Sequence, residues 1–357
     1  MKKLPIILSM AACTSAAFAQ STVSISGTVD LAVRSVDNGA VKQTQMVRDG
    51  INSSRLRFIG TEDLGGGLKA GFWLDMPVRA DDGTGASVFW ERRSTVSLLG
   101  SFGELRLGRD AALQNSGPGD FDAFNGKGVG NVMNLATPRN FSNATTFTRV
   151  NNAVSYLLPN VLGGFYGQVQ LAPGEGVIGA KHSAFALGYK DGPLETRFTY
   201  GRTHVDSVAV VNTITGASTA TAASGSFTYA VLGSSYDFGR AKLMGSLINW
   251  NSAEAVAGSR KQFTYNIGAM VPIGSGSLNV AYTHANRSGL GSDAQDAKQF
   301  AVQYIHSLSK RTAVYASAAR IKQDALATTS NAQYNMDGTN LVGRSGTGFD
   351  FGIRHSF

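Results

Sequence analysis

Arginine recurs at alternate positions in the run SSRLRFIGTEDLGGGLKAGFWLDM, which spans residues 53–76. Arg55 and Arg57 fall on one face of an extended chain, and Leu56 and Phe58 fall on the other, because successive side chains of a strand leave opposite faces. A guanidinium stays charged at any physiological pH and presents a fixed fork of donors that suits anions. This face therefore looks onto water, and the chemistry open to it is the attraction of anions.

Further arginines and three aspartates complete the set of residues that could steer ions. Arg92 and Arg93 open the run RRSTVSLLG, where the parity of Thr95 and Ser97 places Arg93 on the polar face. Arg149 begins another alternating run. Opposite charge is available on the neighbouring arm of the hairpin and in a long connecting segment, from Asp75, Asp120 and Asp122. A narrow passage with low-dielectric walls focuses the field of such residues, so we interpret them as the constriction of a pore.

Other kinds of chemistry find less support. Gly126 to Gly130 superficially resembles a phosphate loop, but no strand-to-helix unit surrounds it. Nothing ties one serine to one histidine, so an outer-membrane hydrolase is only an alternative, and we expect neither an enzyme nor a cofactor. None of the histidines has the spacing of a metal ligand: His182, His204, His284, His306 and His355. The last three share parity with aromatic neighbours, which predicts a role in an aromatic girdle or a subunit contact.

The first 19 residues have the pattern of a secretory signal. Lys2 and Lys3 form a basic head, an apolar middle follows, and Ala17-Phe18-Ala19 gives a small-x-small end, which predicts cleavage before Gln20. A buried N-terminal helix and a lipoprotein at Cys13 are the alternatives. Because Cys13 is the only cysteine, the mature chain would have no disulfide or thiol chemistry.

The mature chain is moderately basic and has no helix that could anchor it. Two of the 32 basic residues lie in the leader, which leaves 30 against 24 acidic residues and a net charge of +6. No basic run is interleaved with aromatic residues, so we expect no nucleic-acid partner. No later stretch approaches the roughly 20 apolar residues of a membrane helix. An exported chain of this kind belongs in the periplasm, the medium or the outer membrane.

Alternating runs that short turns and longer loops connect predict an all-β fold. The first strand is Thr22 to Arg34, a polar loop covers Ser35 to Gly50, and a later strand covers Val88 to Leu99. Seven turns and eight loops join sixteen strands, the pattern of a transmembrane β-barrel with long loops outside the cell and short turns in the periplasm. The last strand, Thr347 to Phe357, would close against the first, and residues 20–357 would form one barrel domain.

One connection, Ala111 to Thr148, is far longer than a compact domain usually tolerates without a function. Four phenylalanines could hold it against the protein: Phe121, Phe124, Phe141 and Phe147. We therefore expect this loop, the third on the outer side, to be ordered and folded into the lumen.

The chain resembles the Gram-negative porins of the β-proteobacterial type along essentially all its mature length. The resemblance rests on the order and spacing of several segments: SISGTVDLAV, SSRLRFIGTEDLGGGLKAGFWL, ERRSTVSLLGSFGELRLGRD, NNAVSYLLPNVLGGF, YKDGPL, YDFGRAKL, SLSKRTAVYASAA and FGIRHSF. It implies a sixteen-stranded homotrimeric channel in the outer membrane, in contact with outer-membrane lipids and lipopolysaccharide. Such a channel passes small hydrophilic solutes and ions by diffusion.

The resemblance also implies roles for the charged residues. In that family basic wall residues face acidic residues of the inward loop, which here suggests Arg55, Arg149 and either Arg92 or Arg93 for the wall and Asp122 for the loop. The family pattern favours Arg92 where parity favours Arg93, so both stay candidates. The loop also carries Lys127 and Arg139. We expect a preference for anions; a substrate-specific anion channel and a secreted adhesin are the other interpretations.

Overall fold

The structure, a computed structural model, describes residues 22–137, 146–175, 180–206, 210–211, 218–219, 224–254, 258–288, 296–324 and 343–357. The expected signal segment, residues 1–19, lies outside this part. The first half contains β1 (Thr22–Asp37), β2 (Lys42–Arg48), β3 (Arg55–Gly65), β4 (Leu68–Pro77), β5 (Arg93–Gly100), β6 (Gly103–Ala111), α1 (Leu113–Asp120), α2 (Met133–Ala136), β7 (Arg149–Leu157), β8 (Phe165–Ala172) and β9 (His182–Asp191). The second half contains β10 (Leu194–Asp206), β11 (Val210–Val211), β12 (Ser218–Thr219), β13 (Ser224–Asp237), β14 (Lys242–Glu254), β15 (Gly258–Ile273), β16 (Gly276–Ser288), β17 (Ala297–Ser307), β18 (Thr312–Gln323) and β19 (Gly346–Ser356).

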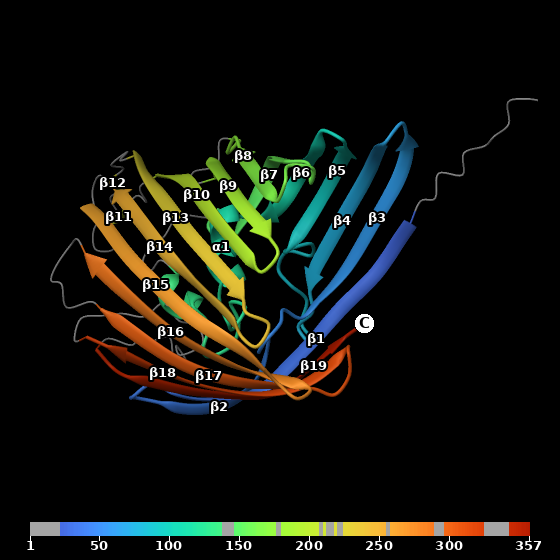
Figure 1. The fold of residues 1–357 in the computed structure, drawn as a ribbon. Helices are drawn as coiled ribbons and strands as arrows, with labels where there is room; N and C mark the ends of the chain where they lie inside the picture. Colours follow the sequence, from blue (N-terminus) through green and yellow to red (C-terminus); the bar gives the residue numbers. More distant parts are fainter. Residues whose placement is uncertain are drawn as a thin grey trace, which may run out of the picture.

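The strands close into an antiparallel barrel (Figure 1). Within β3 to β10 and within β13 to β19 each strand pairs with the next, and β10 pairs with β13. β3 pairs with β1, and β19 returns to pair with β1 from Thr28↔Ser356 to Asp37↔Thr347. Gly27 and Phe357 exchange two backbone hydrogen bonds of 2.9 and 3.0 Å. Closure removes the free sheet edges that a hydrocarbon environment would not tolerate. The predicted pairing of the last strand with the first is confirmed.

The described part of the main sheet has seventeen strands but sixteen positions around the barrel. Both β2 and β3 pair with the same side of β1, β2 along Leu31–Asp37 and β3 along Thr22–Thr28. β2 and β3 therefore lie one after the other along β1 and together fill a single strand position of the barrel. The expectation that residues 35–50 form only a polar loop is wrong, because Lys42–Arg48 forms β2 and β1 continues to Asp37.

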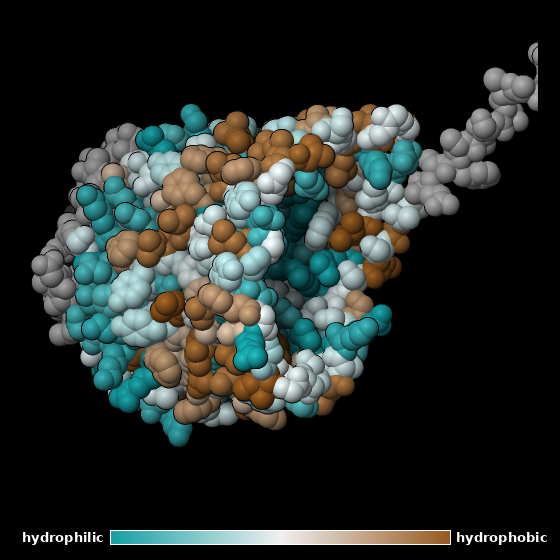
Figure 2. All heavy atoms as spheres, in the orientation of Figure 1, coloured by the Kyte–Doolittle hydropathy of each residue, from teal (hydrophilic) through white to brown (hydrophobic). Residues whose placement is uncertain are grey.

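Side chains alternate between the wall's two faces as the sequence pattern predicts. On β17, Gln299 and Gln303 are buried inside, whereas Phe300 points outward with 60% of its surface exposed. Figure 2 shows brown, apolar side chains over the outer surface and teal, hydrophilic ones inside a hollow. Apolar residues toward lipid and polar ones toward the lumen are the arrangement of a membrane barrel. The ring centroids of His284 and Tyr265 lie 5.3 Å apart, so His284 has the aromatic neighbour that its parity predicts.

The strand expected from Val88 to Leu99 begins only at Arg93. The apolar residues before it do not continue the ladder: the Trp90 ring packs edge-on against Phe58 and Phe89, at 6.0 and 4.9 Å. Aromatic packing on the outer face thus replaces strand pairing over this stretch.

The long connection between β6 and β7 folds into the barrel, where Figure 1 shows α1 enclosed by strands. Phe121 and Phe124 are buried at 2% and 1% exposure, as predicted, and Phe141 lies outside the described residues. Inward polar side chains of the wall bind the loop's backbone: Gln299 donates to the Gly130 oxygen at 2.7 Å, and Asn279 donates to the Ala123 oxygen at 3.1 Å. Neither described helix has the length and hydropathy to cross a membrane.

Candidate functional site

The registers of β3, β4 and β5 bring three predicted residues into one row across the wall. Arg57 lies opposite Asp75, and Asp75 lies opposite Arg93. Directly opposed residues of neighbouring antiparallel strands project from the same face. The carboxylate of Asp75 therefore lies between two arginines, and Asp75 is buried at 4% exposure.

Asp75 also binds the two arginines at the strand ends. Arg55 Nη1 lies 3.8 Å from Asp75 Oδ2, and Arg92 Nε lies 3.3 Å from Asp75 Oδ1. The Arg92 backbone N–H donates to the Asp75 backbone oxygen at 3.2 Å. One carboxylate thus lies among several guanidiniums, so the net charge of this group of side chains is positive.

The alternatives Arg92 and Arg93 both reach the inner side. Arg93 is the first residue of β5 and follows the strand's alternation of faces. Arg92 precedes the strand, so the alternation does not fix the direction of its side chain. The side chain of Arg92 turns to Asp75. Parity therefore locates Arg93 correctly and could not locate Arg92, which lies outside regular pairing.

The surroundings of Arg93 differ from those of the other arginines. Its Cζ lies 4.2 Å from the ring centroid of Trp73, and its Nε donates to Thr95 Oγ1 at 2.9 Å. Asp110 is 3.8 Å from Arg93 and 2.9 Å from Arg106. Cation–π contact and a shared carboxylate hold this guanidinium against the wall. Trp73 therefore lies on the inner side of the wall, beside Arg57 and Arg93.

Arg57 and Arg149 carry the least compensated charge. Among the described residues neither forms an ion pair with a carboxylate, although Arg57 Cζ lies 6.0 Å from the Trp73 ring. Arg149 begins β7, where the inward loop rejoins the wall, and its Nη1 donates to the Thr148 oxygen at 3.0 Å. Their guanidinium charges are therefore the least neutralised of the predicted arginines.

The two aspartates of the loop do not lie opposite this cluster. Asp120, at the end of α1, pairs with Arg197 of β10 at 2.5 Å. Asp122 is buried at 3% exposure, and its Oδ2 accepts from the backbone N–H groups of Gly126 and Val132 at 3.1 and 3.0 Å. Burial raises the pKa of the Asp122 carboxyl to about 6. The structure thus places Asp122 inside the loop as a brace for its backbone rather than as an acid facing the arginines.

Lys127 is a charged residue that the described part of the loop presents to the cluster, whereas Arg139 lies outside the described residues. Burial lowers the pKa of its ammonium, and repulsion by Arg92, Arg149 and Arg55 lowers it further, against attraction by Asp49. Repulsion of this kind requires the four cations to be near one another. Basic groups therefore approach the passage from the wall and from the loop. The sequence shows Lys127 in the loop, but only the path of the loop shows what it faces.

Comparisons with known proteins find relatives along the whole chain. The sequence profile of the Gram-negative porin family matches residues 7–326. Outer membrane porin protein 32 of Delftia acidovorans is 36% identical over 371 aligned residues, which cover all of both chains. An outer membrane porin protein of Bordetella pertussis is 25% identical, and the match covers 86% of this chain and 83% of that one.

Solved structures show the same barrel. The anion-selective porin from Comamonas acidovorans superposes with a TM-score of 0.81 at 34% identity, covering 95% of this chain and all of that one. OmpT of Vibrio cholerae, in its trimer form, superposes with a TM-score of 0.69 at 13% identity over 94% of this chain and 99% of its own, which shows the fold alone.

Proposed function

The chain belongs to the Gram-negative porin family of outer-membrane channels, and from this premise we propose that its pore prefers anions. It passes small hydrophilic solutes and ions by diffusion and leaves them chemically unchanged. Residues 1–19 are its export signal, and residues 20–357 form its single barrel domain.

The observation that supports anion preference is the imbalance of charge around Asp75. Arg55 and Arg92 pair with this one carboxylate, and within the described residues Arg57 and Arg149 form no ion pair. Lys127 adds a further cation from the loop. In a narrow passage between low-dielectric walls, such an excess raises the local concentration of anions and lowers that of cations. A relative at 34% identity is named an anion-selective porin, which agrees with this proposal.

The roles of the constriction residues follow from these surroundings. Arg55, Arg57, Arg92 and Arg149 set the potential of the passage, with Lys127 opposite them. Arg93 is more strongly neutralised and, with Trp73, shapes the wall. The Asp75 carboxylate offsets the repulsion between the arginines and limits the excess of positive charge. Asp120 and Asp122 act in the loop, the first as a tie to β10 and the second as a brace.

The test is the reversal potential of the reconstituted channel in a KCl gradient. Wild-type protein should favour chloride, and the variant R55E/R149E should favour potassium. The control K310E/R311E makes the same change in net charge at the short turn between β17 and β18, and it should keep the wild-type potential. A preference for cations in the wild type would refute the proposal, and an unchanged potential in R55E/R149E would show that another ring sets it.

We also propose that three copies associate in the membrane, as the resemblance to the family implies. An apolar band on the outer face of β1 supports it, since Val23 and Ile25 are 64% and 62% exposed in the single chain. Native mass spectrometry of detergent-extracted protein should give the mass of a trimer, and a monomer at all detergent concentrations would refute it.

A further inference from the structure

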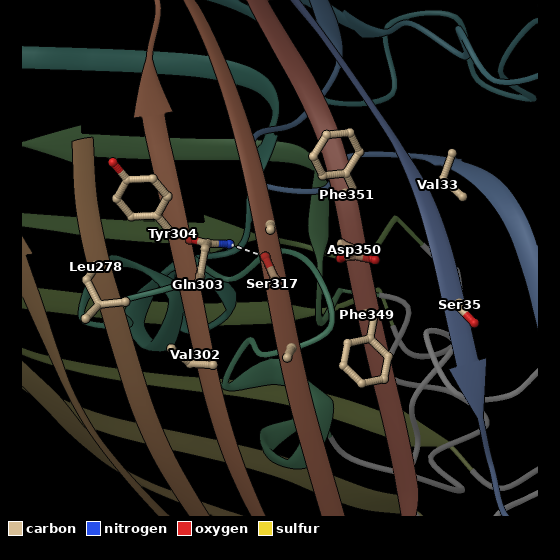
Figure 3. Close-up of a pocket in the computed structure, with 12 residues that line it drawn as sticks. Val33, Ser35, Leu278, Val302, Gln303, Tyr304, Ser317, Phe349, Asp350 and Phe351 are labelled. Atoms are coloured by element: carbon tan, nitrogen blue, oxygen red, sulfur yellow. Dashed lines mark hydrogen bonds between the residues drawn. The ribbon is translucent and has the colours of Figure 1, made fainter. Parts of the chain in front are cut away.

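A cavity of about 330 Å³ lies inside the barrel, between α1 of the inward loop and the wall formed by β7 to β10. It is distinct from the hollow on the outer face that Tyr304, Phe349 and Val33 border (Figure 3). The outer hollow is mostly apolar and reaches β1, so it continues the face for which contact between copies is proposed. Hydroxyl and amide groups line the inner cavity, which therefore suits a polar solute.

The register of three wall strands explains why this cavity exists. Two successive rows of opposed residues cross β8, β9 and β10 on the inner face: Tyr166, Gly188 and Arg197, then Gln168, Ala186 and Thr199. On β9, the middle strand, both rows have a small residue, Gly188 and Ala186. The Tyr166 ring lies over Gly188, because a Cβ at Gly188 would collide with that ring. A shallow trough therefore remains between the larger side chains of β8 and β10.

The helix α1 covers the trough from the lumen side, and two of its side chains line the cavity. At the C-terminal end of the helix, Asp120 pairs with Arg197 at 2.5 Å. Nearer the start of the helix, Gln114 lies over Gly201, where a Cβ would be 2.7 Å from Gln114 Oε1. Arg197 and Gly201 flank Thr199 on β10, so α1 is held against the wall on either side of this residue and the cavity is preformed.

Thr199 offers an unpaired hydroxyl to the cavity. The residue lines the cavity and is 0% exposed. Its Oγ1 has no hydrogen-bond partner within the described part of the chain. Burying a hydroxyl without a partner costs free energy, and a ligand that supplies the partner recovers it. This hydroxyl is therefore the feature of the cavity that points to a bound molecule.

The lining suits an uncharged solute that carries hydroxyl groups. Among the lining residues Arg197 alone is charged, and Asp120 already neutralises it. The other polar side chains of the lining are neutral and can donate as well as accept: Ser116, Asn160, Tyr166, Gln168 and Thr199. The Tyr166 ring, Leu113 and Leu157 add apolar surface. A monosaccharide has hydroxyl groups at its edge and C–H groups on its faces, and the cavity is at the small end of ligand pockets, which measure about 300 to 1,000 Å³.

We propose that this cavity binds one small, neutral, hydroxylated solute of monosaccharide size. Thr199 and Gln168 hold its hydroxyl groups, and the Tyr166 ring lies along its apolar face. The site lies in the half of the barrel near the short turns, since Gln168 is the fourth residue of β8 and Thr199 is the sixth of β10. The arginine cluster lies elsewhere, at β3, β5 and the start of β7. Ions and this solute therefore meet different parts of the lumen, and the proposal goes beyond the preference for anions.

The experiment measures the binding of D-glucose to the purified protein by saturation-transfer difference NMR. The protein is kept in lauryldimethylamine oxide, a detergent without sugar groups, and glycine betaine, which has no O–H or N–H group, is the comparison solute. Wild-type protein should bind D-glucose saturably and should not bind betaine. T199V keeps the shape of the side chain and removes the hydroxyl, so the dissociation constant should rise about fivefold, the effect of one hydrogen bond. Its Tm should not fall, because the hydroxyl that it removes is buried and unpaired within the described residues.

Filling the trough tests the location of the site. A186L places a larger side chain on β9 between Gln168 and Thr199, and it should abolish the binding of D-glucose. The control S246A removes another buried hydroxyl, on the inner face of β14, and should bind D-glucose as wild type does. Binding that does not saturate in wild type, equal binding of betaine, or a wild-type dissociation constant in T199V or A186L would overturn the proposal. An equal loss in S246A would overturn it too. The reversal potential, which tests anion preference, should be the same in wild type, T199V and A186L, so the two proposals can fail separately.

Discussion

The backbone N–H of Val129 donates a 3.2 Å hydrogen bond to the carboxylate of Asp350, which joins the tip of the inward loop to the last strand of the barrel. The same carboxylate accepts two hydrogen bonds from Arg34 of β1, at 2.5 and 2.8 Å. Asp350 is buried at 3% exposure, so it links barrel closure to the position of the loop. We therefore expect the position of the loop in the lumen to depend on Asp350 and Arg34.

Replacing Asp350 by alanine should loosen the loop and weaken the barrel. The change leaves the buried Arg34 guanidinium without its partner, and breaking a buried pair in this way costs about 3–5 kcal/mol. We expect a lower temperature of barrel unfolding, measured by circular dichroism, and noisier single-channel currents with a larger mean conductance. The double variant R34M/D350L should recover much of the thermal stability but not the quiet current, because the hydrogen bond from the Val129 N–H to the Asp350 carboxylate is still missing. Quiet, wild-type currents in both variants would show that the loop is held by other contacts.

Anion preference should fall as pH rises toward the alkaline range, because of Lys127. Its pKa lies below the ordinary 10.5, so it loses its charge before an unperturbed lysine would, while the arginines stay charged. Reversal potentials measured from about pH 7 to about 10.5 should therefore drift toward zero with a midpoint below the ordinary lysine pKa. K127Q should start at a weaker preference and stay level over that range. The same drift in K127Q as in wild type would assign the titration to another group.

Much of the barrel is predictable from alternation, because each wall strand faces lipid on one side and water on the other. The prediction is wrong where that contrast disappears. Lys42–Arg48 has polar residues on both faces, and its two apolar residues, Met46 and Val47, are adjacent, so it gives no period-two signal and its sequence predicts a loop. Val88 to Trp90 is apolar and its sequence predicts a strand, yet the Trp90 ring packs against Phe58 and Phe89 outside the ladder.

The candidate site is predictable only in part, for a related reason. Arg55, Arg57 and Arg93 lie on strands, so their parity fixes the face they take. Loop residues have no such rule. Hydrogen bonds between residues far apart in sequence, such as Gly130 and Gln299, fix the path of the loop. That path decides whether Asp122 is buried or faces the lumen, and which way Lys127 points.

The contribution of Asp122 to the stability of the inward loop should be larger at low pH than at neutral pH. Its pKa in the folded chain is about 6 against 3.8 for the free side chain, so the folded state holds the proton more tightly. Its contribution to stability is therefore fully present below pH 3.8 and is lost as pH rises through about 6, by up to about 3 kcal/mol. D122N removes the titration, and the difference in Tm between it and wild type should change between about pH 4 and about pH 7. A difference that is constant over this range would contradict the prediction.

Neutralising Asp75 should strengthen anion preference and weaken the fold together. Asp75 is the carboxylate closest to Arg55 and Arg92, at 3.8 and 3.3 Å, so D75N leaves these guanidiniums to repel one another. We expect a several-fold rise in the ratio of chloride to potassium permeability, measured as a reversal potential, and a lower Tm. The matched variant D110N should have a smaller effect on selectivity, since Arg106 keeps Glu104 at 2.8 Å as its partner. The prediction depends on the cluster being short of negative charge: if D75N left the potential unchanged while D110N shifted it, the field of the passage would have to be assigned to Arg93 and Arg106 instead.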